Sequence, residues 1–107
     1  MERRRLKRQA CDRPIWFRHG HAAFHPGLCL DLDPQGLQLE TNVEVRVGLY
    51  LELQLNLHRS YPLSLRGRVV WVHRSGSAFR VGLRLQSEVG EVRSLIHWHS
   101  RWAMRAG

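Results

Sequence analysis

The feature that most restricts the fold of this chain is a strict alternation of apolar and polar side chains. It is clearest over residues 49–57, where leucine fills every odd position and polar side chains fill the even ones. Successive side chains of a strand point to opposite faces, so such a segment buries one face and exposes the other. The pattern predicts a β-strand over 49–57 and favours a mainly β fold.

Other short segments share this alternation. The further strands are expected at residues 15–17, 28–32, 37–40, 63–72 and 79–85. Gly67 interrupts the fifth of the six strands and indicates a bulge or a close backbone approach. Residues 42–48 are ambiguous, because Gly48 breaks their alternation. Six short antiparallel strands favour a closed barrel, since closure removes exposed edges.

After Leu85 the apolar period changes from two residues to three or four. Ser87 is a suitable helix N-cap, and acidic residues follow it in the first turn. The pattern predicts a C-terminal α-helix whose apolar stripe covers one opening or edge of the barrel.

The break between the second and third strands reads as a tight turn. Pro34 fixes φ, and Gly36 tolerates a positive φ. The leucines of 28–32 are expected to share the core face. Asp31 and Asp33 are then expected to point away from the core at the mouth of the turn. Their carboxylates could cap backbone N–H groups or contact a ligand, and both interpretations stay open.

The N-terminus is polar and rich in arginine, which dominates a net charge of +8 over 107 residues. We expect one domain, with a flexible basic arm at residues 1–12 and a barrel domain with its helix at 13–107. Arg4 and Arg8 lie four residues apart, with Arg3 and Arg5 beside them. This arm is either a solvated tail or an anion clamp, because guanidinium groups fork onto phosphates and guanine edges.

Several classes of function find no support in the sequence. No nucleophile or base accompanies the two aspartates, so we expect a binding protein and not an enzyme. The histidines at 19, 21 and 25 match no common metal spacing, and no metal or cofactor is expected. Trp71, near the end of a strand, could either pack or stack on a base.

The compartment is predicted from what the chain lacks. No apolar run is long enough to span a bilayer, and no signal peptide opens the chain, so a cytoplasmic protein is expected. Cys11 and Cys29 form no framework and are expected to be reduced, with a single disulfide as the alternative.

Four motifs follow one another along nearly the whole chain. They are Arg-x-x-x-Arg at 4–8, Asp-x-Asp-x-x-Gly at 31–36, Gly-Arg-Val-Val-Trp at 67–71 and Phe-Arg-Val-Gly-Leu at 79–83. In this order the chain resembles the PilZ domain family of bacterial proteins, which bind the second messenger cyclic di-GMP. The resemblance implies a six-stranded antiparallel PilZ-type β-barrel with a C-terminal α-helix.

The resemblance also implies site residues. Arg4 and Arg8 match the arginines that family members wrap around guanine and phosphate. An arginine at the position of Arg3 goes with a stacked ligand dimer in some members. Asp31 and Gly36 match the first and last positions of the family's Asp/Asn-x-Ser-x-x-Gly motif.

Asp33 departs from that motif, because the family has serine there. A carboxylate only accepts hydrogen bonds and carries a charge. It would repel the phosphodiesters of cyclic di-GMP or pair with an arm arginine.

The function implied is a cyclic di-GMP sensor whose arm orders on the ligand and which acts on an effector protein. The alternative, which Asp33 favours, is a divergent adaptor that works by protein contact without nucleotide. Non-specific binding of nucleic acid through the basic charge is a third, less favoured interpretation.

Overall fold

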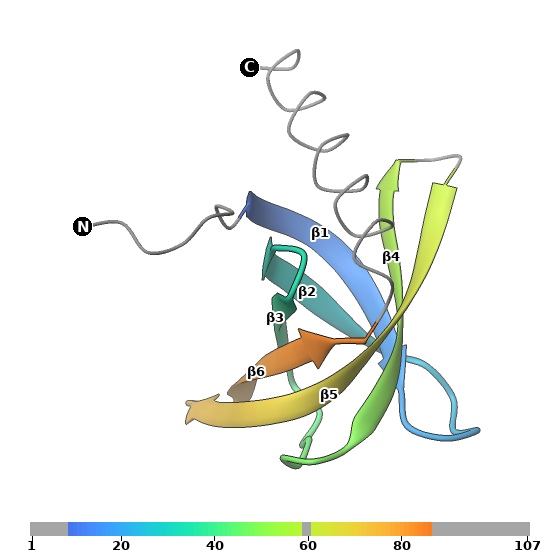
Figure 1. The fold of residues 1–107 in the computed structure, drawn as a ribbon. Coiled ribbons are helices and arrows are strands. Elements are labelled where there is room, and N and C mark those ends of the chain that lie inside the picture. The colour runs from blue at the N-terminus through green and yellow to red at the C-terminus, as the bar shows by residue number, and fades with distance from the viewer. Residues whose placement is uncertain (1–8, 59–60, 87–107) are drawn as a thin grey trace.

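The computed structural model describes residues 9–58 and 61–86 as a closed barrel of antiparallel strands (Figure 1). The strands are β1 (Gln9–Arg18), β2 (His25–Leu32), β3 (Gly36–Thr41), β4 (Tyr50–His58), β5 (Tyr61–Ser75) and β6 (Ala78–Leu85). Their order around the barrel is β1-β2-β3-β6-β5-β4, and β4 pairs with β1 to close it. The predicted mainly β, six-stranded barrel is confirmed. The predicted C-terminal helix lies outside the described residues.

The core lies inside the barrel and is formed by the inward side of the alternating pattern. The leucines at 51, 53 and 55 of β4 are buried, as the alternation predicts. They pack with inward residues of the other strands, among them Ile15, Phe17, Leu39, Val69 and Val81. Burial of such side chains stabilises a fold by about 1.5–3 kcal/mol each.

The first strand begins earlier than its sequence suggests. β1 starts at Gln9, so residues 9–12, expected in the arm, belong to the barrel. Gln9 and Ala10 pair with Leu32 and Asp31 of β2. The ladder shifts register between Ala10 and Arg13. Because of this bulge, the side chains before and after it do not follow one continuous apolar and polar alternation, and the sequence does not show the start of the strand.

The expected faces of β2 are only partly right. Leu32 is buried, as predicted, but at the start of the strand Cys29 is buried and Leu28 is 37% exposed. The β2–β3 ladder shifts register between Cys29 and Asp31. A bulge adds one residue to a strand, so it reverses which side chains face the core from that point on.

Close strand packing explains the glycine of β5. A Cβ on Gly67 would lie 3.2 Å from the Leu83 side chain and 3.3 Å from the Arg84 carbonyl oxygen. Gly67 thus lies where β5 and β6 approach each other closely, and it is not part of a bulge. The bulge of β5 lies between Val69 and Trp71, where the β5–β6 ladder shifts register.

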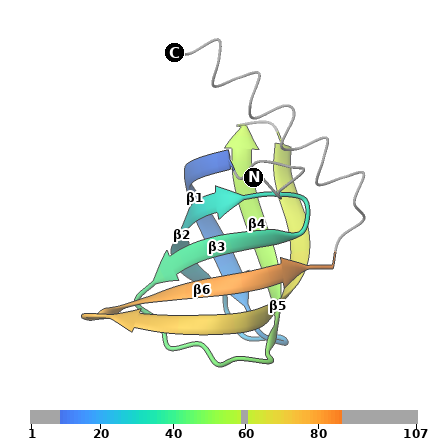
Figure 2. The ribbon, with the colours of Figure 1, turned by 60° about the vertical axis from the view of Figure 1, so that its left-hand side comes forward.

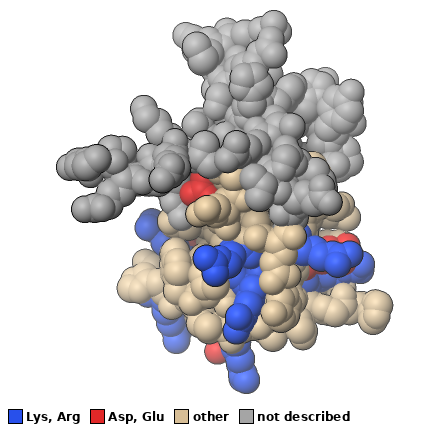
Figure 3. Space-filling model, in the orientation of Figure 1, with Lys and Arg blue, Asp and Glu red and all other residues tan. Residues whose placement is uncertain are grey.

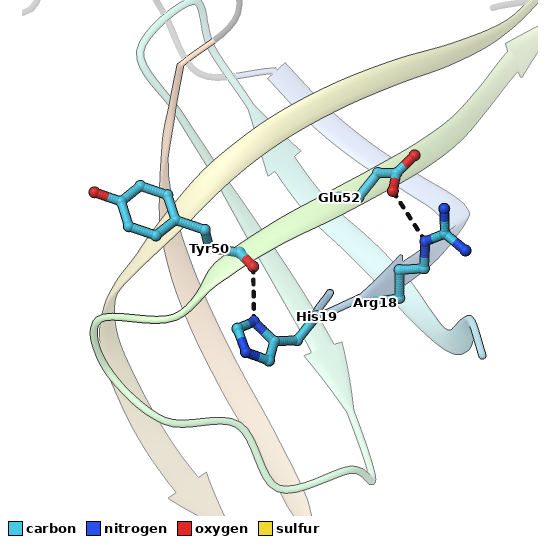
Figure 4. Close-up of polar contacts among 4 residues, drawn as sticks. All are labelled: Arg18, His19, Tyr50 and Glu52. Atoms are coloured by element: carbon cyan, nitrogen blue, oxygen red, sulfur yellow. Dashed lines mark hydrogen bonds and ion pairs between the residues drawn. The ribbon is translucent and has the colours of Figure 1, made fainter. Parts of the chain in front are cut away.

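Polar contacts join the end of β1 to the start of β4 (Figure 4). Arg18 Nε donates to Glu52 Oε1 at 2.9 Å, and these residues face each other in the ladder. The Nδ1 of His19 lies 3.1 Å from the Tyr50 carbonyl oxygen. Both contacts lie where the barrel closes. An ion pair this exposed contributes at most about 1 kcal/mol.

Candidate ligand-binding site

A tight turn joins β2 to β3, as the sequence predicts. The Asp33 N–H donates to the Gly36 carbonyl oxygen at 2.9 Å, and the Gly36 N–H donates back to the Asp33 carbonyl oxygen at 3.3 Å. The turn does not use a positive φ at Gly36: among the described glycines only those at 20, 48 and 76 have one. Pro34, with its fixed φ, initiates the bend.

The side chain of Asp33 holds this turn together. Its Oδ1 accepts the backbone N–H groups of Gln35 and Gly36, each at 2.8 Å. Asp33 is only 8% exposed, because the turn that it caps encloses it. The two contacts satisfy N–H groups that the turn leaves without ladder partners. Of the two roles considered for this carboxylate, the capping role is observed.

This capping contact leads to a prediction about stability. Asp33→Ala is expected to lower the free energy of unfolding by about 1–3 kcal/mol, because it removes the side-chain acceptor of two N–H groups and leaves that of Gly36 only its longer contact with the Asp33 carbonyl oxygen. Asp33→Asn keeps an oxygen at the same place and should have a smaller effect. Urea unfolding followed by circular dichroism measures both. Equal losses for the two variants would contradict the capping role.

Trp71 lies on the outer face of the barrel, directly over Gly82. The bulge of β5 brings Trp71 opposite Gly82 in the ladder. A Cβ on Gly82 would fall 2.1 Å from Nε1 of the indole, so the ring occupies the space that a side chain would take. The ring nevertheless stays 39% exposed. Trp71 therefore packs with one part of its ring and leaves another part open to solvent.

A hollow of about 390 Å³ lies between the turn and this indole. β3, β6 and β5 run side by side beneath it (Figure 2). Its polar lining comes from Asp33, Gln35, Gln38 and Arg84, and Trp71 forms an aromatic wall. Small-molecule sites typically enclose about 300–1,000 Å³. The hollow can therefore accept part of a nucleotide-sized ligand.

The structure unites some of the predicted site residues and not others. Asp33, Gly36 and Trp71, which are distant in sequence, all line the hollow. Asp31 does not line it; it pairs with Ala10 of β1 and Gln38 of β3 in the ladders. The four arm arginines, at positions 3, 4, 5 and 8, lie outside the described residues.

Sequence reasoning missed the other residues that line the hollow, among them Gln38, Gly82 and Arg84. The alternation did assign positions 38 and 84 to the outer faces of their strands. Their meeting depends on the β3–β6 pairing, which joins Gln38 to Gly82 and Gly36 to Arg84. No local pattern reveals that register.

Basic side chains gather beside the hollow. Four residues on neighbouring strands form a row across the sheet, each paired with the next: Gly36, Arg84, Arg68 and Tyr50. The Arg68 guanidinium lies over the Tyr50 ring, 5.9 Å from its centroid. Lys and Arg predominate over acidic residues on the barrel face in Figure 3. This surface is suited to an anionic ligand.

The two cysteines form a buried pair between β1 and β2. Cys11 lies in the bulge of β1, and Cys29 lies on β2. A hydrogen bond from Cys29 lowers the pKa of Cys11. The same contact, together with burial, raises the pKa of Cys29.

Metal binding finds no support in the described part of the chain. Within residues 9–58 and 61–86, no three His, Cys, Asp or Glu side chains gather as metal ligands would. His19, one of the three loop histidines, contacts the Tyr50 carbonyl oxygen instead.

The sequence profile of the PilZ domain matches residues 2–99, and the chain belongs to the PilZ domain family. This is a family of cyclic di-GMP receptor and adaptor domains. PilZ domains generally act by binding and not as enzymes. The resemblance inferred from the four motifs is thereby confirmed. No curated protein matches the chain.

Solved structures share the fold. The PilZ domain of YcgR from Escherichia coli, solved with cyclic di-GMP, superposes with a TM-score of 0.74 at 16% identity, over 98% of this chain and 97% of that one. The Bacillus subtilis inhibitor of motility MotI/DgrA gives 0.74 at 12% identity, over 98% of this chain and 53% of that one. The PilZ domain of CeSA from a cellulose-synthesizing bacterium gives 0.63 at 11% identity, over 91% and 98%.

The chain spans about half the length of MotI/DgrA and of the longer YcgR structure. Among the residues described, no helix is long and apolar enough to cross a membrane.

Proposed function

We propose that this chain is a cyclic di-GMP sensor whose N-terminal arginines close over a ligand held in the hollow. The observation that carries the proposal is the meeting of three features on one side of the barrel. These are the Asp33–Gly36 turn, the half-exposed Trp71 ring and the start of β1. Membership of the PilZ family and the fold shared with a cyclic di-GMP-bound domain support the choice of ligand.

The position of β1 makes the arm available to the hollow. Gln9 pairs with Leu32, and Ala10 pairs with Asp31, immediately before the turn. Arg8 is joined to Gln9 by one peptide bond, and Arg4 is five residues from Gln9, a span of at most about 18 Å. Both arginines can therefore reach a ligand beside the turn.

The chemistry of the parts fits a guanine dinucleotide. Arginine forks bind phosphate oxygens and the O6/N7 edge of guanine. An exposed indole stacks on a base, which contributes about 1–3 kcal/mol. Micromolar affinity requires about 8 kcal/mol, and hydrogen bonds to charged groups contribute about 1.5–3 kcal/mol each. Several arginine contacts plus one stacked base suffice, net of ordering the arm.

Isothermal titration of the full chain with cyclic di-GMP tests the proposal. Micromolar binding is expected, with weaker binding of cyclic di-AMP, which has the same phosphates but lacks the guanine edge. No heat at high micromolar cyclic di-GMP would end the proposal. The divergent adaptor, which Asp33 favours, would then stand; it predicts that a partner protein is captured equally with and without nucleotide.

The Asp33 carboxylate leads to a separate prediction. A single negative charge a few ångströms from a phosphodiester in a solvated site opposes binding by about 1 kcal/mol. Asp33→Ser restores the family residue, and its hydroxyl can still accept a turn N–H. The variant should bind cyclic di-GMP about fivefold more tightly in the same titration. Unchanged or weaker binding would show that the carboxylate does not repel the ligand.

A further inference from the structure

We propose that Arg84 is a ligand-binding residue of the hollow and contacts a phosphate of the nucleotide from the barrel side. The inference rests on the proposed function and adds to it a cation built into β6, separate from the arm. Arg84 lines the hollow, and it faces Gly36 of the turn across the β3–β6 ladder. It thus lies beside the place where the ligand is expected.

The surroundings of Arg84 offer it no anionic partner among the described residues. It is exposed, and neither an ion pair nor a hydrogen bond joins its side chain to another described residue. The neighbouring Arg80, by contrast, lies 3.9 Å from a Glu40 carboxylate oxygen. Among the described residues, the acid that lines the hollow with Arg84 is Asp33, whose Oδ1 accepts two turn N–H groups.

The neighbour of Arg84 on β5 has the same charge. Arg68 and Arg84 face each other directly across the β5–β6 ladder, and both are exposed. Like charges at such a position are destabilising. The Arg68 guanidinium lies over the Tyr50 ring, on the side away from β6. Two facing arginines oppose folding by their repulsion, and an anion bound beside them would neutralise their charge.

A phosphodiester fits this position better than other anionic groups. Arg84 offers a planar fork of N–H donors that matches two phosphate oxygens. The Trp71 ring lies across Gly82 in the same hollow, so a base stacked there would bring its attached phosphate near the strand face. Arg84 would then contact that phosphate from the strand face.

The test compares Arg84→Gln with wild type by titration with cyclic di-GMP and by thermal unfolding without nucleotide. Arg46→Gln is the matched control, since it removes one exposed arginine in the loop between β3 and β4 that does not line the hollow. Arg84→Gln is expected to weaken binding roughly 10-fold, as loss of a charged hydrogen bond does. Its melting temperature should equal or exceed that of wild type, because the repulsion from Arg68 is removed.

Each other result has a definite meaning. Wild-type affinity in Arg84→Gln, or an equal loss in Arg46→Gln, would overturn the inference and leave the proposed function standing. A melting temperature that falls together with the affinity would assign Arg84 a structural role and overturn the inference. Failure of the wild-type chain to bind would overturn the proposed function and, with it, this inference.

Discussion

Replacing Arg4 and Arg8 together with alanine is expected to weaken cyclic di-GMP binding at least 100-fold, on the order of 3 kcal/mol or more. Each guanidinium supplies charge-assisted hydrogen bonds that a methyl group cannot replace, and the arm contributes to affinity only through such contacts. Isothermal titration measures the loss. Urea unfolding without nucleotide, measured beside the titration, shows whether the variant is as stable as wild type.

The control for this pair removes the same charge elsewhere. Arg46 and Arg74 are exposed, and neither lines the hollow. The double variant Arg46→Ala with Arg74→Ala should retain most of the affinity. Only a small loss is expected, because removing two positive charges weakens the protein's attraction for an anionic ligand. If both double variants bind equally weakly, net charge and not the arm explains the binding. If the Arg4/Arg8 variant binds like wild type, the arm has no role in the site.

Gly82→Ala is expected to produce the second large effect. Its Cβ would fall within the Trp71 ring, 2.2 Å from Cε2, so the indole must leave its place. Loss of the stacking wall should reduce affinity for cyclic di-GMP at least 10-fold, on the scale of the 1–3 kcal/mol or so that base stacking contributes. The emission spectrum of the tryptophans should shift as well, because one indole becomes more solvated.

Gly27→Ala is the matched control for steric strain. Its Cβ would lie 3.0 Å from the Glu40 carbonyl oxygen, on strands of the same barrel but outside the lining of the hollow. It should lower the melting temperature and leave the affinity of the folded protein nearly unchanged. Wild-type affinity in Gly82→Ala with a displaced indole would remove Trp71 from the site. An equal loss of affinity in Gly27→Ala would attribute the effect to general destabilisation.

Where the ladder is regular, the sequence was sufficient to predict the fold. Leu51, Leu53 and Leu55 are buried because β4 pairs with β5 over this stretch without a register shift. The turn at 33–36 was predictable because proline, aspartate and glycine favour a bend for independent local reasons. These are properties of neighbouring residues, which a sequence displays directly.

Bulges account for most of what the sequence could not predict. One extra residue between Cys29 and Asp31 reverses the faces of β2, and another between Val69 and Trp71 places the indole over Gly82. Bulges depend on contacts between strands, so no local period reveals them. The position of Arg84 beside the turn depends on the β3–β6 register for the same reason. The site is therefore assembled by pairings that a single sequence does not display.

The most direct test of the central claim is an NMR spectrum of the full chain saturated with cyclic di-GMP. The account predicts intermolecular NOEs from the guanine H8 proton to the Trp71 ring, and shifts of the Gly36 and Gly82 amides. It also predicts NOEs between the arginine side chains of the arm and the same ligand. NOEs confined to another face, such as that of Trp16 on β1, with the amides of the hollow unmoved, would contradict it.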